Sequence, residues 1–404
     1  MVNEIFEKYY QQGQIQAQQR KWEEAICSYK KAIEIQPESH QAYIQLGDAF
    51  RSSGNLDWSI DCYIKAVQID PKVGVSYVRL KRLIDHPDIL PNQIERISQF
   101  GLEVLKERAN NKQAQSIVIN GLSSLGKVEE AIKFCKQIAY ENNVRLKPNF
   151  VKNHWDESNK REPHFIIAGF MKCGTTSLYD YIAQHPNVLP ASQKEIMFFN
   201  NENLYGLGLD WYRANFPPIP ENSTYLTGEA STLYGFDSTV AQRLRKGFPN
   251  IKLIFILRNP VDRAISHYFF DLKSRGLSTS IDKIVSLGIK KVSQMKNVEQ
   301  DINGCRGVVS AGLYVYFLKQ WMNIFPKEQI LVLTLEDLAK NTEDVMNRVF
   351  NFLDLPRHRI LKPTKNNSGS YNSVNDEIRL QLSRFFKPYN EDLEKLLGEE
   401  LCWQ

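Results

Sequence analysis

The chain has 404 residues, of which 42% are hydrophobic and 24% charged, as in ordinary folded globular proteins. At roughly 150 residues per domain, this length predicts two to three domains. The formal net charge of +5 is spread along the chain and is not gathered in a basic arm. That distribution argues against nucleic-acid binding and leaves room for a small anionic ligand.

Cysteine usage and the apolar stretches indicate the compartment. Six cysteines are scattered without any CxxC pair, which excludes a zinc ribbon or thioredoxin-like site and argues against a disulfide scaffold. The first residues include Glu4 and Glu7 and no apolar core, unlike a secretory signal. The longest apolar stretches, such as 251–257, are far shorter than the roughly 20 residues that span a bilayer. We therefore expect a cytoplasmic protein without a membrane span.

The first third of the chain repeats with a regular period. Four pairs of identical residues are 34 positions apart: Gly13 and Gly47, Tyr29 and Tyr63, Ala32 and Ala66, and Pro37 and Pro71. Each unit contains two helical patterns, with small residues where helices would approach and a proline after the second helix. The pattern resembles the tetratricopeptide repeat, which implies an all-α repeat domain that we place at residues 1–145.

The repeat becomes less regular after its second unit. Residues 72–110 are helical in pattern but contain HPDILPNQ, and a partial unit returns at 126–143. We predict seven or eight helices with a degenerate middle repeat. The repeats could bind a protein or peptide partner, form packing or dimerisation contacts, or cover the following domain. The polar segment 146–162 lacks periodicity, which predicts a linker before a second domain at 163–404.

The second domain begins with a strand, a glycine-containing loop and a helix. The strand HFIIA (164–168) leads into GFMKCGTTSL and then into a helical pattern. This order aims backbone N–H groups and a helix N-terminus at an anion. Lys172 supplies a charge, Gly174 permits the turn, and hydroxyl groups come from Thr175, Thr176 and Ser177. Lys172 precedes Gly174, so the loop is not a standard nucleoside-triphosphate loop. A turn with an incidental lysine is the alternative interpretation.

A second candidate anion site follows another buried strand. The apolar strand 251–257 ends at Arg258, and a helix is predicted to begin near Pro260. Arg258 and Ser266, two helical turns later, can reach one crevice at the carboxyl edge of a sheet. A guanidinium and a hydroxyl suit a phosphate monoester. An arginine paired with a surface carboxylate is the alternative.

These motifs resemble those of sulfotransferases. GFMKCGTTSL resembles their 5′-phosphosulfate-binding loop, and LRNPVDRAISHY resembles their 3′-phosphate-binding motif. KEIMFF (194–199) and GEASTLY (228–234) are most similar to blocks of the heparan sulfate sulfotransferases and their bacterial relatives. The resemblance covers roughly 163–404. It implies a P-loop-like α/β domain with a central parallel sheet, which uses 3′-phosphoadenosine 5′-phosphosulfate (PAPS), releases 3′-phosphoadenosine 5′-phosphate (PAP) and requires no metal.

The resemblance also implies a role for each matching residue. Lys172 would contact the bridging oxygen and 5′-phosphate and stabilise the leaving group, and Glu195 would be the general base. The 5′-phosphosulfate would be bound by Gly174, Thr175, Thr176 and Ser177, and the 3′-phosphate by Arg258, Ser266 and the C-terminal loop residues Ser368, Gly369 and Ser370. Tyr314 belongs to a block that borders the nucleotide in relatives.

The resemblance leaves the acceptor less defined than the donor. It implies transfer to a hydroxyl or amine, with a glycan favoured and a small molecule as an alternative. Ala230 stands where the heparan-type branch commonly has a lysine that contacts acidic glycan, which argues against a heparan-like acceptor. Two other functions are considered: an inert sulfotransferase-like domain on a tetratricopeptide scaffold, and a P-loop nucleotide phosphotransferase. Metal-dependent ATP binding in place of PAP binding would favour the latter.

Overall fold

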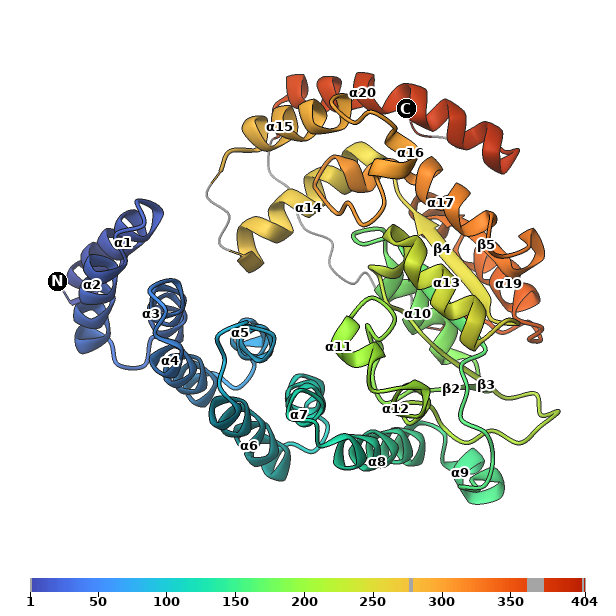
Figure 1. The fold of residues 1–404 in the computed structure, drawn as a ribbon, viewed down its shortest axis with the longest axis horizontal. Helices are drawn as coiled ribbons and strands as arrows, with labels where there is room; N and C mark the ends of the chain where they lie inside the picture. Colours follow the sequence, from blue (N-terminus) through green and yellow to red (C-terminus); the bar gives the residue numbers. More distant parts are fainter. Residues whose placement is uncertain (1, 276–278, 362–373, 402, 404) are drawn as a thin grey trace. The chain divides into compact units, whose positions relative to one another are not determined.

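The structure is a computed structural model that describes residues 2–275, 279–361, 374–401 and 403 (Figure 1). The chain divides into two compact units, Met1–Phe134 and Cys135–Gln404. Over residues 2–146, all of which are described, eight helices follow one another, as predicted. They are α1 (Val2–Gln18), α2 (Trp22–Ile35), α3 (His40–Ser52), α4 (Leu56–Ile69), α5 (Gly74–Ile84), α6 (Pro91–Glu107), α7 (Lys112–Ser124) and α8 (Val128–Leu146).

The 34-residue period arises from a repeated contact between a glycine and a tyrosine. A Cβ atom at Gly13 would lie 2.6 Å from Tyr29 Cε1, and one at Gly47 would lie 2.7 Å from Tyr63 Cε1. Both tyrosines are fully buried. Only a residue without a side chain allows the helices to approach this closely, so the glycine and the tyrosine recur together.

The second unit contains a parallel sheet, as predicted. In the described part of the chain, five strands are arranged in the order β2-β3-β1-β4-β5, and every pairing is parallel. The strands are β1 (Phe165–Gly169), β2 (Val188–Leu189), β3 (Leu226–Glu229), β4 (Lys252–Leu257) and β5 (Ile330–Thr334). Every residue of β1 is buried, as are Leu253–Leu257 of β4, because helices cover a parallel sheet on both faces.

Helices of various lengths connect and cover the strands. They are α9 (Pro148–His154), α10 (Thr175–Gln184), α11 (Glu202–Tyr205), α12 (Leu209–Arg213), α13 (Ser238–Gly247), α14 (Pro260–Arg275), α15 (Ile281–Ser293), α16 (Val298–Asp301), α17 (Tyr314–Met322), α18 (Leu335–Lys340), α19 (Thr342–Phe352) and α20 (Asp376–Leu397). Helix α10 contacts α19, α13 contacts α17, and α14 contacts α20. None of the helices within the described ranges is both long and apolar enough to cross a bilayer.

The segment expected to be a linker contains structure of its own. Helix α9 occupies part of 146–162 and begins at Pro148, whose missing N–H costs nothing in the first turn. Phe150 is 2% exposed and packs on Tyr225, with 4.7 Å between the ring centroids. A seven-residue helix is too short to show a periodic pattern, and its burial against a distant tyrosine is not visible in the sequence.

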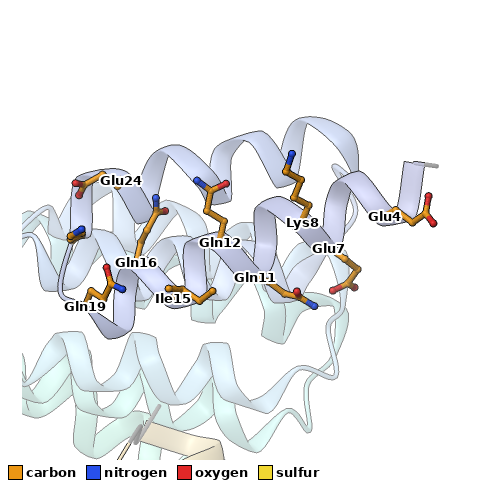
Figure 2. A pocket seen from close by; sticks show the side chains of 10 residues that line it. Glu4, Glu7, Lys8, Gln11, Gln12, Ile15, Gln16, Gln19 and Glu24 are labelled. Carbon is orange, nitrogen blue, oxygen red and sulfur yellow. The ribbon is translucent and has the colours of Figure 1, made fainter.

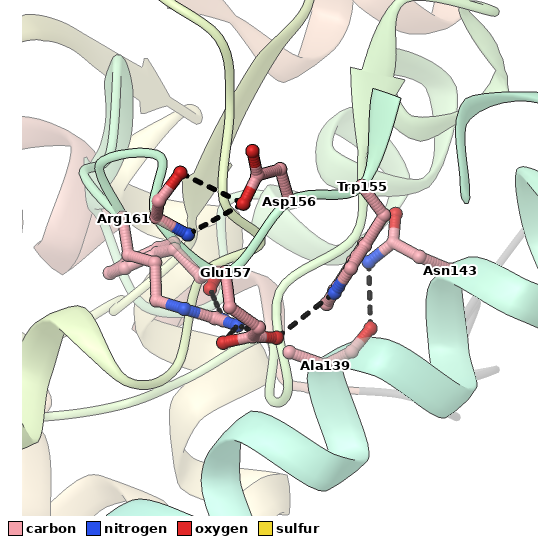
Figure 3. A network of polar contacts seen from close by, with 8 residues as sticks. Ala139, Asn143, Trp155, Asp156, Glu157 and Arg161 are labelled. Carbon is pink, nitrogen blue, oxygen red and sulfur yellow. Dashed lines mark hydrogen bonds and ion pairs between the residues drawn. The ribbon is translucent and has the colours of Figure 1, made fainter. Parts of the chain in front are cut away.

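A polar network follows α9 (Figure 3). Arg161 donates to both carboxylate oxygens of Glu157, each at 2.7 Å, and the indole N–H of Trp155 donates to Glu157 at 2.9 Å. Arg161 is 7% exposed and also donates to the backbone carbonyl of Phe216 at 2.5 Å. These contacts fix the end of the segment to the rest of the second unit.

Candidate active site

The carboxyl ends of β1 and β4 bring the two predicted anion-binding motifs together. The strands are adjacent and parallel, with Gly169 paired to Phe255. The loop after β1 leads into α10, and Arg258 directly follows β4. Because ligands of open parallel sheets bind beyond the carboxyl ends of the strands, this edge is the candidate active site.

The loop after β1 needs a glycine immediately before α10. Gly174 has a φ of +88° and precedes the first helical residue, Thr175. A Cβ atom at Gly174 would also lie 2.5 Å from Leu335 Cδ1. Conformation and space therefore both require glycine here. The first N–H groups of the ten-residue α10 have no partners within the helix, so they suit an anion.

Lys172 and Arg258 lie side by side at this edge. Arg258 Nη1 donates to the backbone carbonyl of Lys172 at 3.4 Å. Burial, followed by the positive charge of Arg258, lowers the pKa of the Lys172 ammonium. This ammonium also lies 4.6 Å from the centroid of the Phe270 ring. Two partly desolvated cations this close would be stabilised by a bound anion.

Tyr314 supports both loops from within the core. It is 1% exposed, and its hydroxyl donates to the carbonyl of Arg258 at 2.9 Å. The same hydroxyl lies 3.4 Å from Cys173 Sγ. The predicted nucleotide-binding residue Tyr314 is thus placed behind the loops, where its hydroxyl contacts protein atoms.

The other predicted nucleotide-binding residues differ in exposure. Thr175 is 4% exposed, whereas Thr176 and Ser177 are only partly buried. Ser266 lies within α14 and is 2% exposed. The predicted residues Ser368, Gly369 and Ser370 lie outside the described residues.

Glu195 lies in an irregular segment between β2 and α11, beside the loop after β1. The neighbouring Lys194 Nζ donates to Thr176 Oγ1 at 2.6 Å and is 3.4 Å from Glu195 Oε1. This link brings the predicted base next to the predicted phosphosulfate loop. The Glu195 side chain is 43% exposed, so the protein alone does not desolvate it. Sequence reasoning did not single out Lys194, although it directly precedes Glu195.

A different carboxylate, Glu229, is the buried one. It is 0% exposed, and burial raises its pKa to about 7. The Tyr212 hydroxyl donates to Glu229 Oε1 at 2.8 Å, and the Ile196 N–H donates to Oε2 at 3.1 Å. Glu229 therefore holds the backbone that follows Glu195.

Ser231 and Tyr234 extend this support. The Ser231 hydroxyl donates to Glu229 and accepts the Met197 N–H at 3.0 Å. The Tyr234 hydroxyl donates to Glu229 at 3.2 Å and accepts the Phe198 N–H at 2.8 Å. Consecutive backbone N–H groups of the 196–198 stretch are thus bound by one buried cluster.

Binding elsewhere in the molecule would need a cluster of metal ligands or another hollow. Among the described residues, no group of three or more His, Cys, Asp or Glu side chains could hold a metal ion. In the first unit, an open hollow of about 790 Å³ lies on α1 and near the start of α2. Figure 2 shows the side chains that line it. Four glutamines, three glutamates, two lysines and one isoleucine line it: Glu4, Glu7, Lys8, Gln11, Gln12, Ile15, Gln16, Gln19, Lys21 and Glu24.

An α/β domain with cations at the carboxyl edge of a parallel sheet defines an anion-binding protein, and comparison with known families names the class. The family described as "Sulfotransferase domain" matches residues 162–388. The chain belongs to this sulfotransferase family. Families described as "TPR repeat" and "Tetratricopeptide repeat" match residues 8–50 and 40–73, which confirms the N-terminal repeats.

Curated relatives match about 60% of the chain at modest identity, and the chain spans less than two thirds of two of the three described below. The chain is 27% identical over 315 residues to "Membrane-associated sulfotransferase kil1" of Dictyostelium discoideum, covering 60% of this chain and 66% of that protein. It is 29% identical to human "Heparan sulfate glucosamine 3-O-sulfotransferase 5", covering 60% of this chain and 74% of that protein. For human "Bifunctional heparan sulfate N-deacetylase/N-sulfotransferase 3", the values are 28% identity, 59% of this chain and 30% of that protein.

A solved structure of a sulfotransferase from Alicyclobacillus acidocaldarius is also similar. It is 26% identical, with a TM-score of 0.48, and the match covers 59% of this chain and 97% of that chain.

Proposed function

We propose that this sulfotransferase moves the sulfuryl group of PAPS to a hydroxyl or amine of an acceptor, for which a glycan is favoured, and releases PAP. The observation that carries the proposal is the contact between Arg258 and Lys172 at the carboxyl edge of β1 and β4. The names of relatives include both an O-sulfotransferase and an N-sulfotransferase of heparan sulfate, so they support either acceptor atom.

The residues of this edge suit a bisphosphorylated nucleotide. In the proposal, Lys172 and the start of α10, with Gly174, Thr175, Thr176 and Ser177, bind the 5′-phosphosulfate. Arg258, Ser266 and the loop 368–370 bind the 3′-phosphate. Tyr314 acts as a positioning residue, since its hydroxyl is bonded to the carbonyl of Arg258.

Two side chains do the chemistry in this proposal. PAPS supplies an activated sulfuryl group whose transfer needs in-line geometry and stabilised negative charge. The Lys172 ammonium stabilises charge that develops on the leaving group. The Glu195 carboxylate accepts the proton of the acceptor hydroxyl or amine. The Glu195 side chain is 43% exposed, so an acceptor that binds at this edge can reach its carboxylate.

PAP binding tests the nucleotide assignment. We expect PAP to raise the melting temperature and to bind by isothermal titration calorimetry, whereas ATP with Mg²⁺ should do neither. Lys172→Ala and Arg258→Ala should each weaken PAP binding by about tenfold or more, because each removes a charge-assisted contact. Lys160→Met is the matched control, because Lys160 is 70% exposed and pairs with Glu221. If millimolar PAP neither raises the melting temperature of the wild-type protein nor binds to it, the proposal loses its basis.

Transfer from radiolabelled PAPS to pools of acceptors then tests the chemistry. Lys172→Ala should lose most turnover, and Glu195→Gln should lose about 10²-fold or more in kcat while keeping its affinity for PAP. Unchanged turnover of Glu195→Gln would assign the base elsewhere. The cytoplasmic location and a protein partner on the repeat surface remain predictions, for which fractionation and co-purification are the measurements.

A further inference from the structure

Lys194 connects the two halves of the proposed site. Its ammonium nitrogen is 2.6 Å from Thr176 Oγ1 in α10 and 3.4 Å from Glu195 Oε1. Its backbone carbonyl accepts the Ala230 N–H at 2.8 Å, and its side chain is only 21% exposed. Both the backbone and the side chain are therefore fixed, unlike those of a solvated surface lysine.

The donors and acceptors of this contact give it a direction. An ammonium group has three donor protons and no acceptor, so Thr176 Oγ1 must accept from Lys194. The single hydroxyl proton of Thr176 is then left to be donated to a different acceptor. Thr176 is the second residue of α10, where backbone N–H groups lack partners within the helix and favour an anion. Lys194 thus keeps the hydroxyl available as a donor at an anion-binding helix N-terminus.

The second contact of Lys194 concerns the candidate base. A solvent-exposed carboxylate on an irregular segment would sample several rotamers, and an ammonium 3.4 Å away restricts it electrostatically. The pair Lys160–Glu221 shows the contrast, because both of its side chains are about 70% exposed and surface ion pairs of that kind stabilise little.

Resting on the function proposed above, we propose that Lys194 is a positioning residue that couples donor binding to proton removal. It directs the Thr176 hydroxyl toward the 5′-phosphosulfate and holds the Glu195 carboxylate beside the same loop. Lys194 acts through Thr176 and Glu195, and neither role requires it to touch the reacting atoms.

A double-mutant cycle on PAP affinity tests the coupling between Lys194 and Thr176. The four chains are the wild type, Lys194→Met, Thr176→Val, and the double variant, each measured by isothermal titration calorimetry. We expect each single substitution to weaken PAP binding about five- to tenfold. The double variant should bind PAP about as tightly as the weaker-binding single variant. This non-additivity follows if Lys194 affects PAP only through the hydroxyl that Thr176→Val removes. A double variant whose loss equals the product of the single losses would overturn the proposal.

Conservative substitution and kinetics separate positioning from general structural support. Lys194→Arg, which keeps the charge and the donors, should restore PAP affinity to within about threefold of wild type. Lys194→Met should lower kcat about tenfold at saturating PAPS, because Glu195 loses its neighbour, while the control Lys160→Met changes neither quantity. If Lys194→Met does not fold, Lys194→Gln takes its place, because it removes the ammonium group and keeps a polar side chain of similar length.

The outcomes distinguish this inference from the proposed function. If wild-type protein fails to bind PAP, the proposed function is wrong and the inference falls with it. If wild-type protein binds PAP but Lys194→Met behaves like Lys160→Met, only the role of Lys194 is wrong.

Discussion

Two carboxylates of the catalytic domain have opposite environments. Glu195 is exposed, whereas Glu229 is fully buried among hydroxyl groups and a backbone N–H. Burial disfavours the ionised form of Glu229, and the donors only partly offset this cost, so its pKa rises to about 7. The buried carboxylate organises the segment that carries the exposed one.

The stability of the protein should therefore depend on the protonation of Glu229. A carboxyl whose pKa is higher in the folded than in the unfolded chain binds its proton more tightly when folded. The free energy of unfolding then falls as the pH rises from about 4.5 to about 7, by at most about 1.4 kcal/mol per pH unit, and levels off above. Glu229→Gln should lack this slope, so the wild type should lose about 2–3 kcal/mol relative to the variant between pH 5 and pH 8.

Denaturant unfolding at several pH values measures this difference. Glu221→Gln is the control, because Glu221 is an exposed carboxyl whose pKa is lowered by its hydrogen bond to Lys160. If the curves of wild type and Glu229→Gln run parallel from pH 5 to pH 8, then Glu229 is ionised at no cost in the folded chain.

At this scale, the sequence motifs predict some residues of the site and not others. Lys172 and Arg258 each follow a recognisable buried strand, and parallel strands place both at one edge. Lys194 and Glu229 could not be assigned in this way. The direction of the Lys194 side chain depends on an irregular segment, whose path is set by buried hydrogen bonds between residues more than 30 positions apart.

Among the elements, the helices of the repeats depend on their glycines. The space at Gly47 in α3 is filled by the buried ring of Tyr63 in α4, and Cys62 Cβ would lie 3.1 Å from an added Cβ. Asp48 accepts a hydrogen bond from the Tyr63 hydroxyl at 2.8 Å and another from Arg79 of α5 at 3.0 Å. The tyrosine ring is thus held in place and cannot move away at low cost.

Gly47→Ala should destabilise the repeat unit by about 1–3 kcal/mol, because an added methyl group overpacks the crossing of α3 and α4. Gly74→Ala is the matched control: Gly74 also lies in a helix, nothing would lie within 4 Å of its added Cβ, and alanine is the better helix former. Thermal unfolding followed by circular dichroism compares the two variants. Equal melting temperatures would contradict the packing argument.

The elements themselves are predicted from sequence where their pattern is strong. The apolar runs at 164–168 and 251–257 correspond to β1 and β4, and the 34-residue period corresponds to paired helices. Helix α9 has only a weak sequence pattern. Its stability comes from Phe150, which packs on residues far along the chain. Local pattern cannot reveal an element that tertiary contacts stabilise.

For the molecule as a whole, the start of the catalytic unit lies before the motif-bearing strand. Asn143 near the end of α8 donates to the carbonyl of Pro190 at 2.9 Å, and Lys147 donates to that of His185 at 2.7 Å. Burial lowers the pKa of Lys147 to about 8. Arg161 adds its bond to the carbonyl of Phe216. Asn143 and Arg161 thus satisfy the carbonyls of Pro190 and Phe216. Lys147 adds a second donor to the carbonyl of His185, which also accepts the Val188 N–H at 3.1 Å.

Two fragments test where the catalytic unit begins. Residues 127–404 keep all of α8 and α9, whereas residues 163–404 correspond to the domain predicted from the motifs alone. The shorter fragment loses the side-chain donors to the carbonyls of Pro190 and Phe216 and one of the two donors to that of His185. It also exposes the apolar surface that Phe150 covers. An unpaired acceptor costs about 1–3 kcal/mol, so the loss at Pro190 and Phe216, together with the exposed apolar surface, is a large part of the stability of a typical domain. We therefore expect 127–404 to fold and to bind PAP within about twofold of the full chain, and 163–404 to aggregate or melt at a much lower temperature.

His185 and Pro190 lie shortly before Lys194 in the chain. A 163–404 fragment that does fold should therefore still bind PAP less tightly than the longer fragment. Equal melting temperatures and PAP affinities for the two fragments would show that residues 146–162 are a linker, as their polar sequence predicts.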